Sequence, residues 1–508
     1  MDRIAKVIAF CGALALTACS GKGKYITYEQ FGAVGDGVHD DFPAIVEAHN
    51  AANERGLPVK ADDEKTYLIK GDGLCAVIKT DVDFGNAHFI IDDVGLEHYT
   101  TPIFQVVSDL KPEIITGVTT LAKGQKSLGV TLTCRSLVQV VDSTENVYIR
   151  MGPNRNNGTA KTEMMVVGRN GDIEETSAPV WDYGTITSMT AYPIDKGTLT
   201  IKGGNFTTIA NQMPSEYTYN HRGIQIGRSN VVVKDMVHLV EGELDHGAPY
   251  SGFICIGTAS DILVTGCTFT AHKTYQTIGS AGLPVSMGSY DLNAAYAVNI
   301  RWEHSRQTTD INDSGYWGLF GSNFCKNLSM DDVYFSRFDA HMGVKDVNLT
   351  NSTFGYMGVG LVGFGTLLID SCEIRAHRIV SFRDDYGSSW DGDIIIRNTT
   401  FKPQDPNRSS ISLISGFNDG THDFGYECCL PSRIEMENVT IDDSGFTNED
   451  YAGPNIFGTF GRDVTKAGLY PFKAEGKVVM KNVSTASGKP IGVSLNEKMF
   501  NGYEIVRE

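Results

Sequence analysis

Histidine, arginine and tyrosine side chains that could act on an acidic sugar gather in the middle of this chain. Of its twelve histidines, six lie between residues 221 and 341, and arginines follow them at short intervals. Breaking a uronic acid chain by elimination needs a base, a cation that neutralises the sugar carboxylate, and an acid for the departing oxygen. We expect His341 to be the base, Arg337 to be the cation and the phenol of Tyr356 to be the acid.

Other side chains of the same region leave each of these roles open. His304 and Lys273 are alternative bases, and the guanidinium groups of Arg375 and Arg378 are alternative cations. The phenol of Tyr356 suits either the acid or the base of a syn elimination. The chemistry is therefore predicted more firmly than the residue that performs each step.

Further residues are predicted to contact the substrate from the same face. They are His272, Lys273, Arg306, Asp339, Arg375, His377, Arg378 and Trp317. Asp339 would also orient a neighbouring catalytic group. A purely structural interpretation stands beside this one, because Arg337 and Asp339 can form a surface ion pair worth at most about 1 kcal/mol.

Carboxylates in the second half of the chain offer a different chemistry, hydrolysis by a paired acid and base. The available residues are Asp310, Asp313, Asp384, Asp385, Asp391 and Asp393. The last four also form the kind of oxygen-rich group that binds Ca²⁺, so calcium stays open as a cofactor and no metal site is assigned. Three tryptophans, Trp302, Trp317 and Trp390, could stack on sugars in an enzyme or in a non-catalytic binding protein.

A repeated sequence pattern places these side chains on consecutive windings of one structure. From residue 199 onward, a short β-branched run leads to a small or amide residue at a turn and then to more strand-like residues. The turn residues are Gly204, Asp235, Gly266, Asp332, Asn351, Ser371, Asn398, Asn438 and Asn482. The shortest intervals, Asp332 to Asn351 and Asn351 to Ser371, are 19 and 20 residues, which suits one rung of a parallel β-helix. A β-propeller, the alternative all-β fold, needs more even spacing.

The chain divides into four predicted segments. Residues 1–19 read as a lipoprotein signal peptide, residues 20–104 as an N-terminal cap with the first rungs, residues 105–190 as a β-rich insertion, and residues 191–508 as the main β-helix with the catalytic face. A proline-started amphipathic helix over residues 43–55 would cover the N-terminal end of the stack. The insertion would either cover the first rungs or also contribute to the substrate groove.

Composition and the N-terminus limit the partners. A formal net charge of −18 argues against nucleic acid as a partner, whereas local arginine clusters still allow an acidic polysaccharide. Leu16-Thr17-Ala18-Cys19 matches a lipobox, so a lipid on Cys19 is the expected membrane contact. The residues directly after Cys19 carry no acidic side chain, which favours the periplasmic face of the outer membrane over the cell surface. We expect the remainder to be a monomer.

The opening FGAVGDGVHDD, followed by AIVEAHNAA and GLPV, resembles the start of the pectin-lyase-like superfamily of right-handed parallel β-helices. That resemblance implies an all-β, right-handed parallel β-helix and, most often, a polysaccharide lyase or glycoside hydrolase. The segment NFCKNLSMDDVYFSRFDAHMGV, together with the β-rich insertion, also resembles secreted glycosaminoglycan-degrading proteins of Bacteroidetes, with polysaccharide lyase family 29 the nearest. The implied function is β-elimination of a uronic-acid polysaccharide such as chondroitin sulfate, dermatan sulfate or hyaluronan. A glycoside hydrolase and a non-catalytic glycan-binding solenoid are the alternatives.

Overall fold

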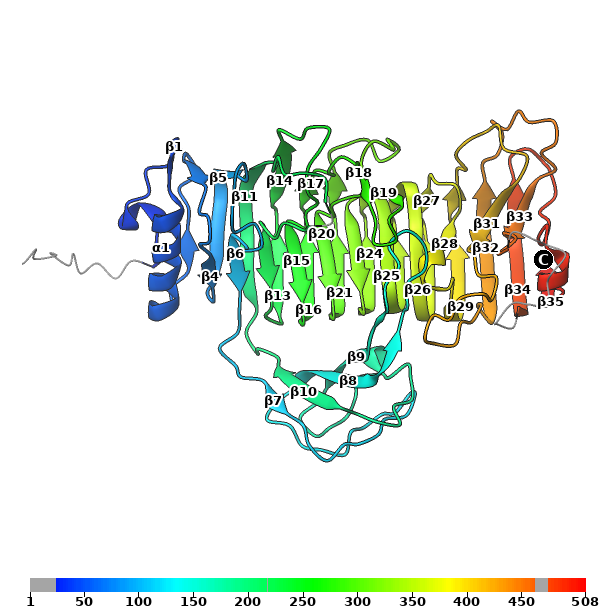
Figure 1. Cartoon of the computed structure of the whole chain (residues 1–508), viewed down its shortest axis with the longest axis horizontal. Helices are drawn as coiled ribbons and strands as arrows, with labels where there is room; N and C mark the ends of the chain where they lie inside the picture. The colour runs from blue at the N-terminus through cyan, green and yellow to red at the C-terminus, as the bar shows by residue number, and fades with distance from the viewer. Residues whose placement is uncertain (1–23, 217, 462–473) are drawn as a thin grey trace, which may run out of the picture.

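The computed structural model describes residues 24–216, 218–461 and 474–508. Over these residues the chain winds into a long parallel β-helix with a helix at its N-terminal end, and a small antiparallel sheet projects from one side (Figure 1). This confirms the fold class predicted from the sequence. The signal peptide predicted over residues 1–19 and the lipidation predicted at Cys19 lie outside the described residues and stay predictions.

Parallel pairing joins 29 strands of the described chain, and each full winding contributes to three faces. The first face contains β2 (Val59–Lys60), the start of β5 (Val82–Asp92) and of β11 (Leu199–Ile209), β13 (Val231–Lys234), β16 (Ser260–Thr265), β21 (Val298–Glu303), β24 (Lys326–Asp331), the ends of β25 (Tyr334–Thr350) and β26 (Thr353–Asp370), β29 (Trp390–Arg397), the start of β32 (Arg433–Ile441) and of β34 (Glu475–Thr485), and β35 (Gly502–Arg507). The second face contains β1 (Asp36–Asp40), β3 (Thr66–Ile69), the ends of β5 and β11, β14 (Val237–Glu241), β17 (Thr268–Phe269), β22 (Arg306–Gln307), the starts of β25 and β26, β27 (Glu373–Ile374), β30 (Thr400–Phe401), and the ends of β32 and β34. The third face contains β4 (Ala76–Ile78), β6 (Phe104–Val106), β12 (Ile224–Ile226), β15 (Ile254–Gly257), β20 (Leu292–Ala295), β23 (Phe320–Asn323), the middle of β25 and β26, β28 (Val380–Phe382), β31 (Ile411–Ser415) and β33 (Pro454–Phe457).

A column of left-handed turn residues separates the first face from the second. All nine turn residues predicted from the sequence have φ values between 49° and 90°, a backbone conformation that Gly, Asn and Asp tolerate best. The amides also bond along the stack: Asn482 Nδ2 donates to Asn438 Oδ1 at 2.9 Å, and Asn438 Nδ2 donates to Asn398 Oδ1 at 3.1 Å. At these asparagine bends, the side-chain amide thus bonds to the neighbouring rung and helps to fix its register.

The helix α1 (Phe42–Arg55) covers the N-terminal end of the core. Its first turn contains Pro43, and Gly56 with φ 63° ends it. The side chains of Phe42, Ile45 and Ala48 are fully buried against the first rungs. The other helical segments are η1 (Tyr28–Phe31), η2 (Glu175–Ser177), η3 (Asp384–Tyr386) and α2 (Glu497–Phe500). None of the helices in the described residues is long and apolar enough to cross a membrane.

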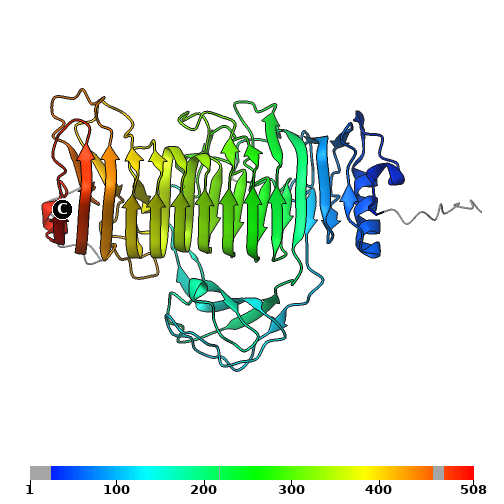
Figure 2. The same cartoon turned by 180° about the vertical axis from the view of Figure 1, so that it is seen from behind.

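The projecting sheet lies in the chain between β6 and β11 and hangs below the β-helix in both views (Figure 2). Its antiparallel order is β7 (Glu113–Ile114), β10 (Ser188–Pro193), β8 (Ser136–Val147) and β9 (Thr159–Val167). A buried ion pair joins it to the first face: Lys326 Nζ lies 2.6 Å from Glu163 Oε2, and both side chains are only 3% exposed. Lys326 also donates to the carbonyls of Ser177 and Ala178, so the sheet has one fixed orientation.

Candidate active site

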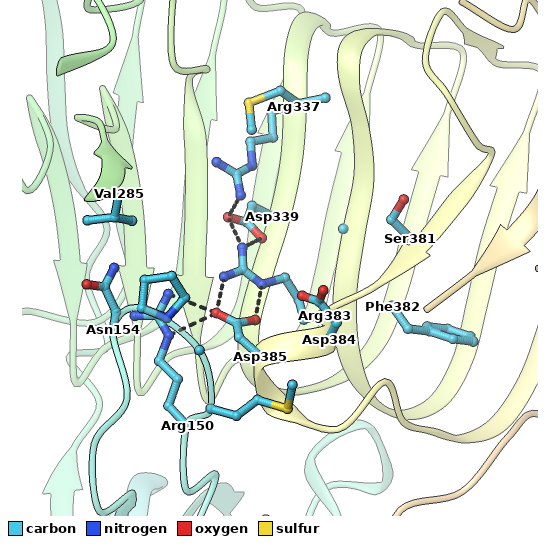
Figure 3. Close-up of a pocket in the computed structure, with 15 residues that line it drawn as sticks. Arg150, Asn154, Val285, Arg337, Asp339, Ser381, Phe382, Arg383, Asp384 and Asp385 are labelled. Atoms are coloured by element: carbon cyan, nitrogen blue, oxygen red, sulfur yellow. Dashed lines mark hydrogen bonds and ion pairs between the residues drawn. The ribbon is translucent and has the colours of Figure 1, made fainter. Parts of the chain in front are cut away.

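A cavity of about 410 Å³ lies where the insertion meets the third face of the β-helix. Its base includes Asp339 of β25 and Gly360 of β26, while the loop that follows β8, residues 150–154, forms one wall (Figure 3). Ser381 and Phe382 of β28 lie on the other side. The insertion therefore contributes to this cavity, and its ion pairs reach Asp261, Lys326 and Asp385, which belong to later windings than the first rungs.

Asp339 is the centre of the cavity's hydrogen-bond network and is fully buried. Arg383 Nη1 donates to both of its oxygens, at 3.0 and 3.1 Å, and Arg337 forms an ion pair with Oδ2. The hydroxyl of Tyr290 donates to Oδ2 at 2.8 Å, and His341 Nε2 lies 2.7 Å from the same oxygen. Burial alone would raise the pKa of Asp339, but the surrounding cations hold that pKa well below its usual range.

A second carboxylate, Asp385, ties the insertion to this network. Arg383 bridges the two carboxylates, donating from Nε and Nη2 to Asp385 at 3.0 and 2.8 Å. Arg150 of the insertion donates from Nε to Asp385 at 2.9 Å and lies over the ring of Tyr386. The chain Asp339, Arg383, Asp385 and Arg150 crosses the cavity in Figure 3, so the wall and the base are held by charge-assisted bonds.

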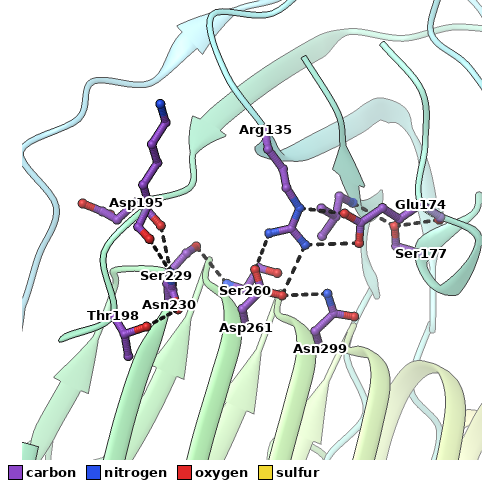
Figure 4. A network of polar contacts seen from close by, with 12 residues as sticks. Arg135, Glu174, Ser177, Asp195, Thr198, Ser229, Asn230, Ser260, Asp261 and Asn299 are labelled. Carbon is purple, nitrogen blue, oxygen red and sulfur yellow. Dashed lines mark hydrogen bonds and ion pairs between the residues drawn. The ribbon is translucent and has the colours of Figure 1, made fainter. Parts of the chain in front are cut away.

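The insertion that supplies Arg150 is braced a second time at its far side (Figure 4). Arg135, which precedes β8, donates from Nε to Glu174 at 2.6 Å and forms an ion pair with Asp261, a left-handed turn residue of the β-helix. Asp261 also accepts a bond from Asn299 Nδ2 at 2.8 Å. The position of the cavity wall is therefore set from both ends of the insertion.

The surroundings of His341 keep its imidazole neutral, which is the state that a general base requires. It lies two residues beyond Asp339 on the same strand, so both side chains leave the same side, and its Nε2 is 2.8 Å from the hydroxyl of Tyr290. An ionised Asp339 can only accept, so the proton lies on Nε2 and the lone pair lies on Nδ1. Burial and the charges of Arg383 and Arg337 lower the pKa of His341, although Asp339 opposes them. The imidazole is therefore neutral at pH 7.

Arg337 has a donor that the fold leaves unused. Its guanidinium lies over the rings of Trp317 and Tyr290, at 4.9 and 5.6 Å from the centroids, and one nitrogen pairs with Asp339. Its Nη1 is buried and has no hydrogen-bond partner among the described residues. A buried donor without a partner is costly, so this atom is suited to receive an anionic group of a ligand in the cavity that Arg337 lines.

Glycines on both neighbouring rungs make room for the network around Asp339. Gly360 of β26 pairs directly with Asp339. On the other side, a Cβ added to Gly321 of β23 would lie 2.9 Å from a carbon of the Tyr290 ring. The ring of Tyr290 can therefore cross the strand and reach Asp339 only because residue 321 has no side chain.

We expect the substitution Gly321→Ala to push Tyr290 out of place and to lower the free energy of unfolding by about 1–3 kcal/mol. Chemical denaturation measures this change. Gly257→Ala is the matched control, since residue 257 lies on the same face and an added Cβ there meets nothing within 4 Å. Equal stability of the two variants would contradict the role given to Gly321.

The structure brings four of the predicted site residues together, namely Arg337, Asp339, His341 and Trp317. Tyr356 lies close to Arg337, but its hydroxyl donates to the backbone carbonyl of Tyr316. Burial raises the pKa of Tyr356 to about 12, so the phenol stays protonated while its proton is already engaged. Its predicted role as the acid is thus less well supported than the roles of His341 and Arg337.

Two histidines that the sequence analysis placed at the site, His304 and His272, lie away from the cavity, so their predicted roles are corrected. His304 is itself a left-handed turn residue with φ 49°, and its Nδ1 lies 2.9 Å from Asp332 at the exposed bend between the first and second faces. His272 is only 2% exposed and is bound to Glu243 at 2.9 Å, so it supports a loop and is closed to substrate. Lys273 belongs to the same loop, where its Nζ donates to the carbonyl of Glu243 at 3.1 Å.

The two arginines Arg306 and Arg375 lie on the second face, away from the strands that form the cavity. Arg306 of β22 lies opposite Tyr334 of the neighbouring strand β25. Arg375 Nη1 lies 3.4 Å from the hydroxyl of Tyr334. Arg375 also forms an ion pair with Glu373. Trp302 and Trp390 are fully buried in the core, so Trp317 is the tryptophan of the three that reaches the site.

His377 and Arg378 lie on a continuation of the cavity along the third face. A second cavity of about 260 Å³ shares Ser381, Phe382 and Asp384 with the first, and a third of about 170 Å³ shares Arg378 and Ser415 with the second. The three cavities follow one another across the rungs of β25, β26, β28, β31 and β33 and share these wall residues, and we refer to this row of cavities as the groove. A linear polymer can lie across consecutive rungs in this groove.

The aspartates considered as calcium ligands do not fit that role. Asp385 is neutralised by Arg383 and Arg150, and Asp391 forms an ion pair with Lys123 at 2.6 Å. In the described parts of the chain, no group of three or more His, Cys, Asp or Glu side chains is placed to hold a metal ion. No catalytic step is therefore assigned to a metal.

Three residues of the site escaped the sequence analysis, namely Tyr290, Arg383 and Arg150. Arg383 had a usable signal, because it directly follows a strand and precedes the pair Asp384 and Asp385. Tyr290 and Arg150 had none, since both belong to irregular segments whose path depends on the rest of the fold.

Comparisons with known proteins concern the fold alone. No family model matches this chain, and no curated protein matches it either. Among solved structures, a tailspike of Pseudomonas phage phi297 aligns at 12% identity with a TM-score of 0.48, over 91% of this chain and 81% of the tailspike. An exopolygalacturonase from Thermotoga maritima aligns at 9% identity and a TM-score of 0.32, over 95% of this chain and 91% of the enzyme. The A-module of a mannuronan C-5 epimerase from Azotobacter vinelandii aligns at 11% identity and a TM-score of 0.31, over 95% and 94%.

Proposed function

We propose that this protein is a polysaccharide lyase that cleaves a uronic-acid polysaccharide by β-elimination. One observation carries the proposal: Asp339, which lines the cavity, holds both a neutral imidazole, His341, and a guanidinium with an unused donor, Arg337. A lyase needs this pair, because the proton next to a carboxylate becomes acidic only when the carboxylate charge is neutralised. The groove across the rungs offers room for the polymer.

In the proposed reaction, Arg337 Nη1 donates to the carboxylate of the uronic acid, and Nδ1 of His341 removes the proton from C5. The electron pair of the C5–H bond becomes the second bond between C4 and C5, and the bond from C4 to the glycosidic oxygen breaks. That oxygen leaves with the electrons of its bond and takes up a proton. Asp384 lines the cavity, whereas the proton of Tyr356 is already donated to a backbone carbonyl, so Asp384 is the better placed acid.

For the substrate we propose a glycosaminoglycan such as chondroitin sulfate, dermatan sulfate or hyaluronan. The segment of residues 323–344, which resembles polysaccharide lyase family 29, contains Arg337, Asp339 and His341. A resemblance that covers the site itself supports a shared chemistry more than one that covers the scaffold. We further propose that the protein acts as a monomer at the periplasmic face of the outer membrane, anchored through Cys19.

A glycoside hydrolase is the second candidate, favoured by the raised pKa of Asp384 next to two other aspartates. Hydrolysis also needs a carboxylate free to act as base or nucleophile. Asp339 and Asp385 are each paired with two arginines, which makes both carboxylates weak bases. The arrangement therefore favours elimination.

The decisive experiment incubates the chain without residues 1–19 with chondroitin, dermatan, hyaluronan, heparin, pectin and alginate. We expect ultraviolet absorbance from a double bond conjugated with the carboxylate to grow with at least one glycosaminoglycan. New reducing ends without this absorbance would establish hydrolysis and overturn the lyase proposal. Absence of both signals on every polymer would leave a binding protein as the remaining function.

A further inference from the structure

A cluster of basic side chains lines the far end of the groove, beyond the residues assigned to the reaction. The third cavity is bordered by His377, Arg378 and Arg408. The hydroxyl and amide groups beside them belong to Ser410, Ser412, Ser415, Asn455 and Thr459. Within the described chain, the lining of this cavity includes no aspartate or glutamate, although acidic residues outnumber basic ones in the protein as a whole.

Two of these basic side chains, Arg378 and His377, have polar nitrogens that the protein does not use. Arg378 forms no ion pair or side-chain hydrogen bond with any described residue, and Nδ1 of His377 is buried without a hydrogen-bond partner. Arg408 is bound to Asp405 through Nε at 3.0 Å, in a pair that is 40% and 47% exposed. Most other arginines of the site are paired with carboxylates, so Arg378 differs from them in having an uncompensated charge.

The charges of Arg378 and Arg408 also repel each other. Burial and then the charge of Arg408 lower the pKa of both Arg378 and His377. An anion bound between them would remove this repulsion and would satisfy the unused donors. Only a ligand can supply this stabilisation, because no carboxylate among the described lining residues neutralises the two arginines from within the cavity.

The cluster is placed to meet the same polymer as the reactive groups. It adjoins β31 and β33, which follow β28 along the third face, with Ser381 paired to Ser415 and Ser412 paired to Asn455. Rungs are about 4.8 Å apart, so the cluster lies roughly 10–15 Å from Asp339 along the groove. That places it beside a sugar further along the polymer than the unit next to the cleaved bond.

We propose that His377, Arg378 and Arg408 form a subsite for an anionic substituent of the substrate, a sulfate ester or a carboxylate on a sugar beyond the cleaved bond. This rests on the proposed function in that it takes the groove to hold an acidic glycan. The surrounding serine hydroxyls donate from several directions, which suits the tetrahedral oxygens of a sulfate better than a planar carboxylate. Sulfation is then a property that this protein selects for.

Binding measurements test the subsite without turnover. The probes are chondroitin oligosaccharides of one length, unsulfated, 4-sulfated or 6-sulfated, with a chitin oligosaccharide as the neutral reference. Each is titrated at one salt concentration into a His341→Ala protein that also carries Arg378→Met or the control Arg397→Met. Arg397 is an exposed arginine paired with Asp370 at the opposite bend of the rung. Arg408→Met is the second variant if Arg378→Met fails to fold.

We expect a sulfated probe to bind about tenfold tighter than the unsulfated one, and Arg378→Met to abolish this difference while Arg397→Met keeps it. An equal loss of about tenfold for all chondroitin probes, but not for chitin, identifies a carboxylate as the bound group. Unchanged binding of every probe in Arg378→Met and Arg408→Met would overturn the subsite, as would the failure of all probes to bind.

Turnover separates this inference from the proposed reaction. In a protein with His341 intact, Arg378→Met is expected to raise KM for the sulfated polymer about tenfold with little change in kcat. If no unsaturated product forms but binding still depends on Arg378, the lyase proposal is overturned and the subsite stands. If product forms with kinetics insensitive to Arg378, only the subsite is overturned.

Discussion

The substitution His341→Ala is expected to lower kcat for the elimination about 10²- to 10⁴-fold, the usual contribution of a positioned general base. The groove and Arg337 stay in place, so KM should change little. Initial rates of absorbance increase on the preferred glycosaminoglycan measure both constants. The loss should be confined to turnover, because His341 is partly exposed and its removal leaves Asp339 with both of its arginines.

His304→Ala supplies the comparison, since His304 is an exposed histidine that is also paired with an aspartate but lies in the turn column. It should retain the activity of the unaltered protein. A large loss in His304→Ala with near-normal activity in His341→Ala would reverse the assignment of the base. Thermal unfolding of both variants checks that each is folded.

The pH dependence follows from the same histidine. The pKa of His341 is lowered from its ordinary value of about 6.5, first by burial and then by the charge of Arg383. The base is lost when Nδ1 takes a proton, so activity should fall as the pH drops through that lowered pKa. We therefore expect the acid limb of kcat/KM below pH 6.5, and a midpoint well above pH 6.5 would exclude His341.

Local patterns in the sequence were enough to predict the scaffold and one strand of the site. The turn column was predictable because Asn, Asp and Gly tolerate left-handed backbone, so their recurrence marks each bend. Arg337, Asp339 and His341 were predictable as a group because alternate residues of one strand share a side. His304 was misplaced because histidine also tolerates the left-handed bend, and a search for small and amide residues did not recognise it as a turn.

The remaining partners could not be predicted, since their positions depend on contacts between distant segments. Arg150 reaches Asp385 across a sequence separation of 235 residues, and its path is set by the two attachments of the insertion, through Lys326 and Arg135. Tyr290 reaches Asp339 only because Gly321 lacks a side chain. The residues next to Arg150 or Tyr290 in the sequence give no sign of either contact.

The substitution Asp339→Asn should have the largest combined effect, because it removes the charge that both Arg337 and Arg383 share. Arg383 keeps Asp385, but leaving the buried Arg337 without its carboxylate costs about 3–5 kcal/mol of unfolding free energy, measurable by chemical denaturation. The same change frees His341 and Arg337 from their common anchor, and misplacement of such groups by about 1 Å costs on the order of 10²-fold in kcat. Because Asp339 raises the pKa of His341 against burial, the acid limb of the residual activity should move further toward low pH.

Asp370→Asn is the matched control, since Asp370 also accepts bonds from an arginine and an amide, Arg397 and Asn398, but at an exposed bend. Its expected cost is at most about 1 kcal/mol. The pKa of Asp339 is depressed in the folded protein, so its stabilisation is present above the unfolded value of about 3.9 and is lost as the pH falls through the folded value. The stability gap between Asp339→Asn and the unaltered protein should therefore narrow in strong acid. If the gap is below 1 kcal/mol at neutral pH, Asp339 does not organise the site.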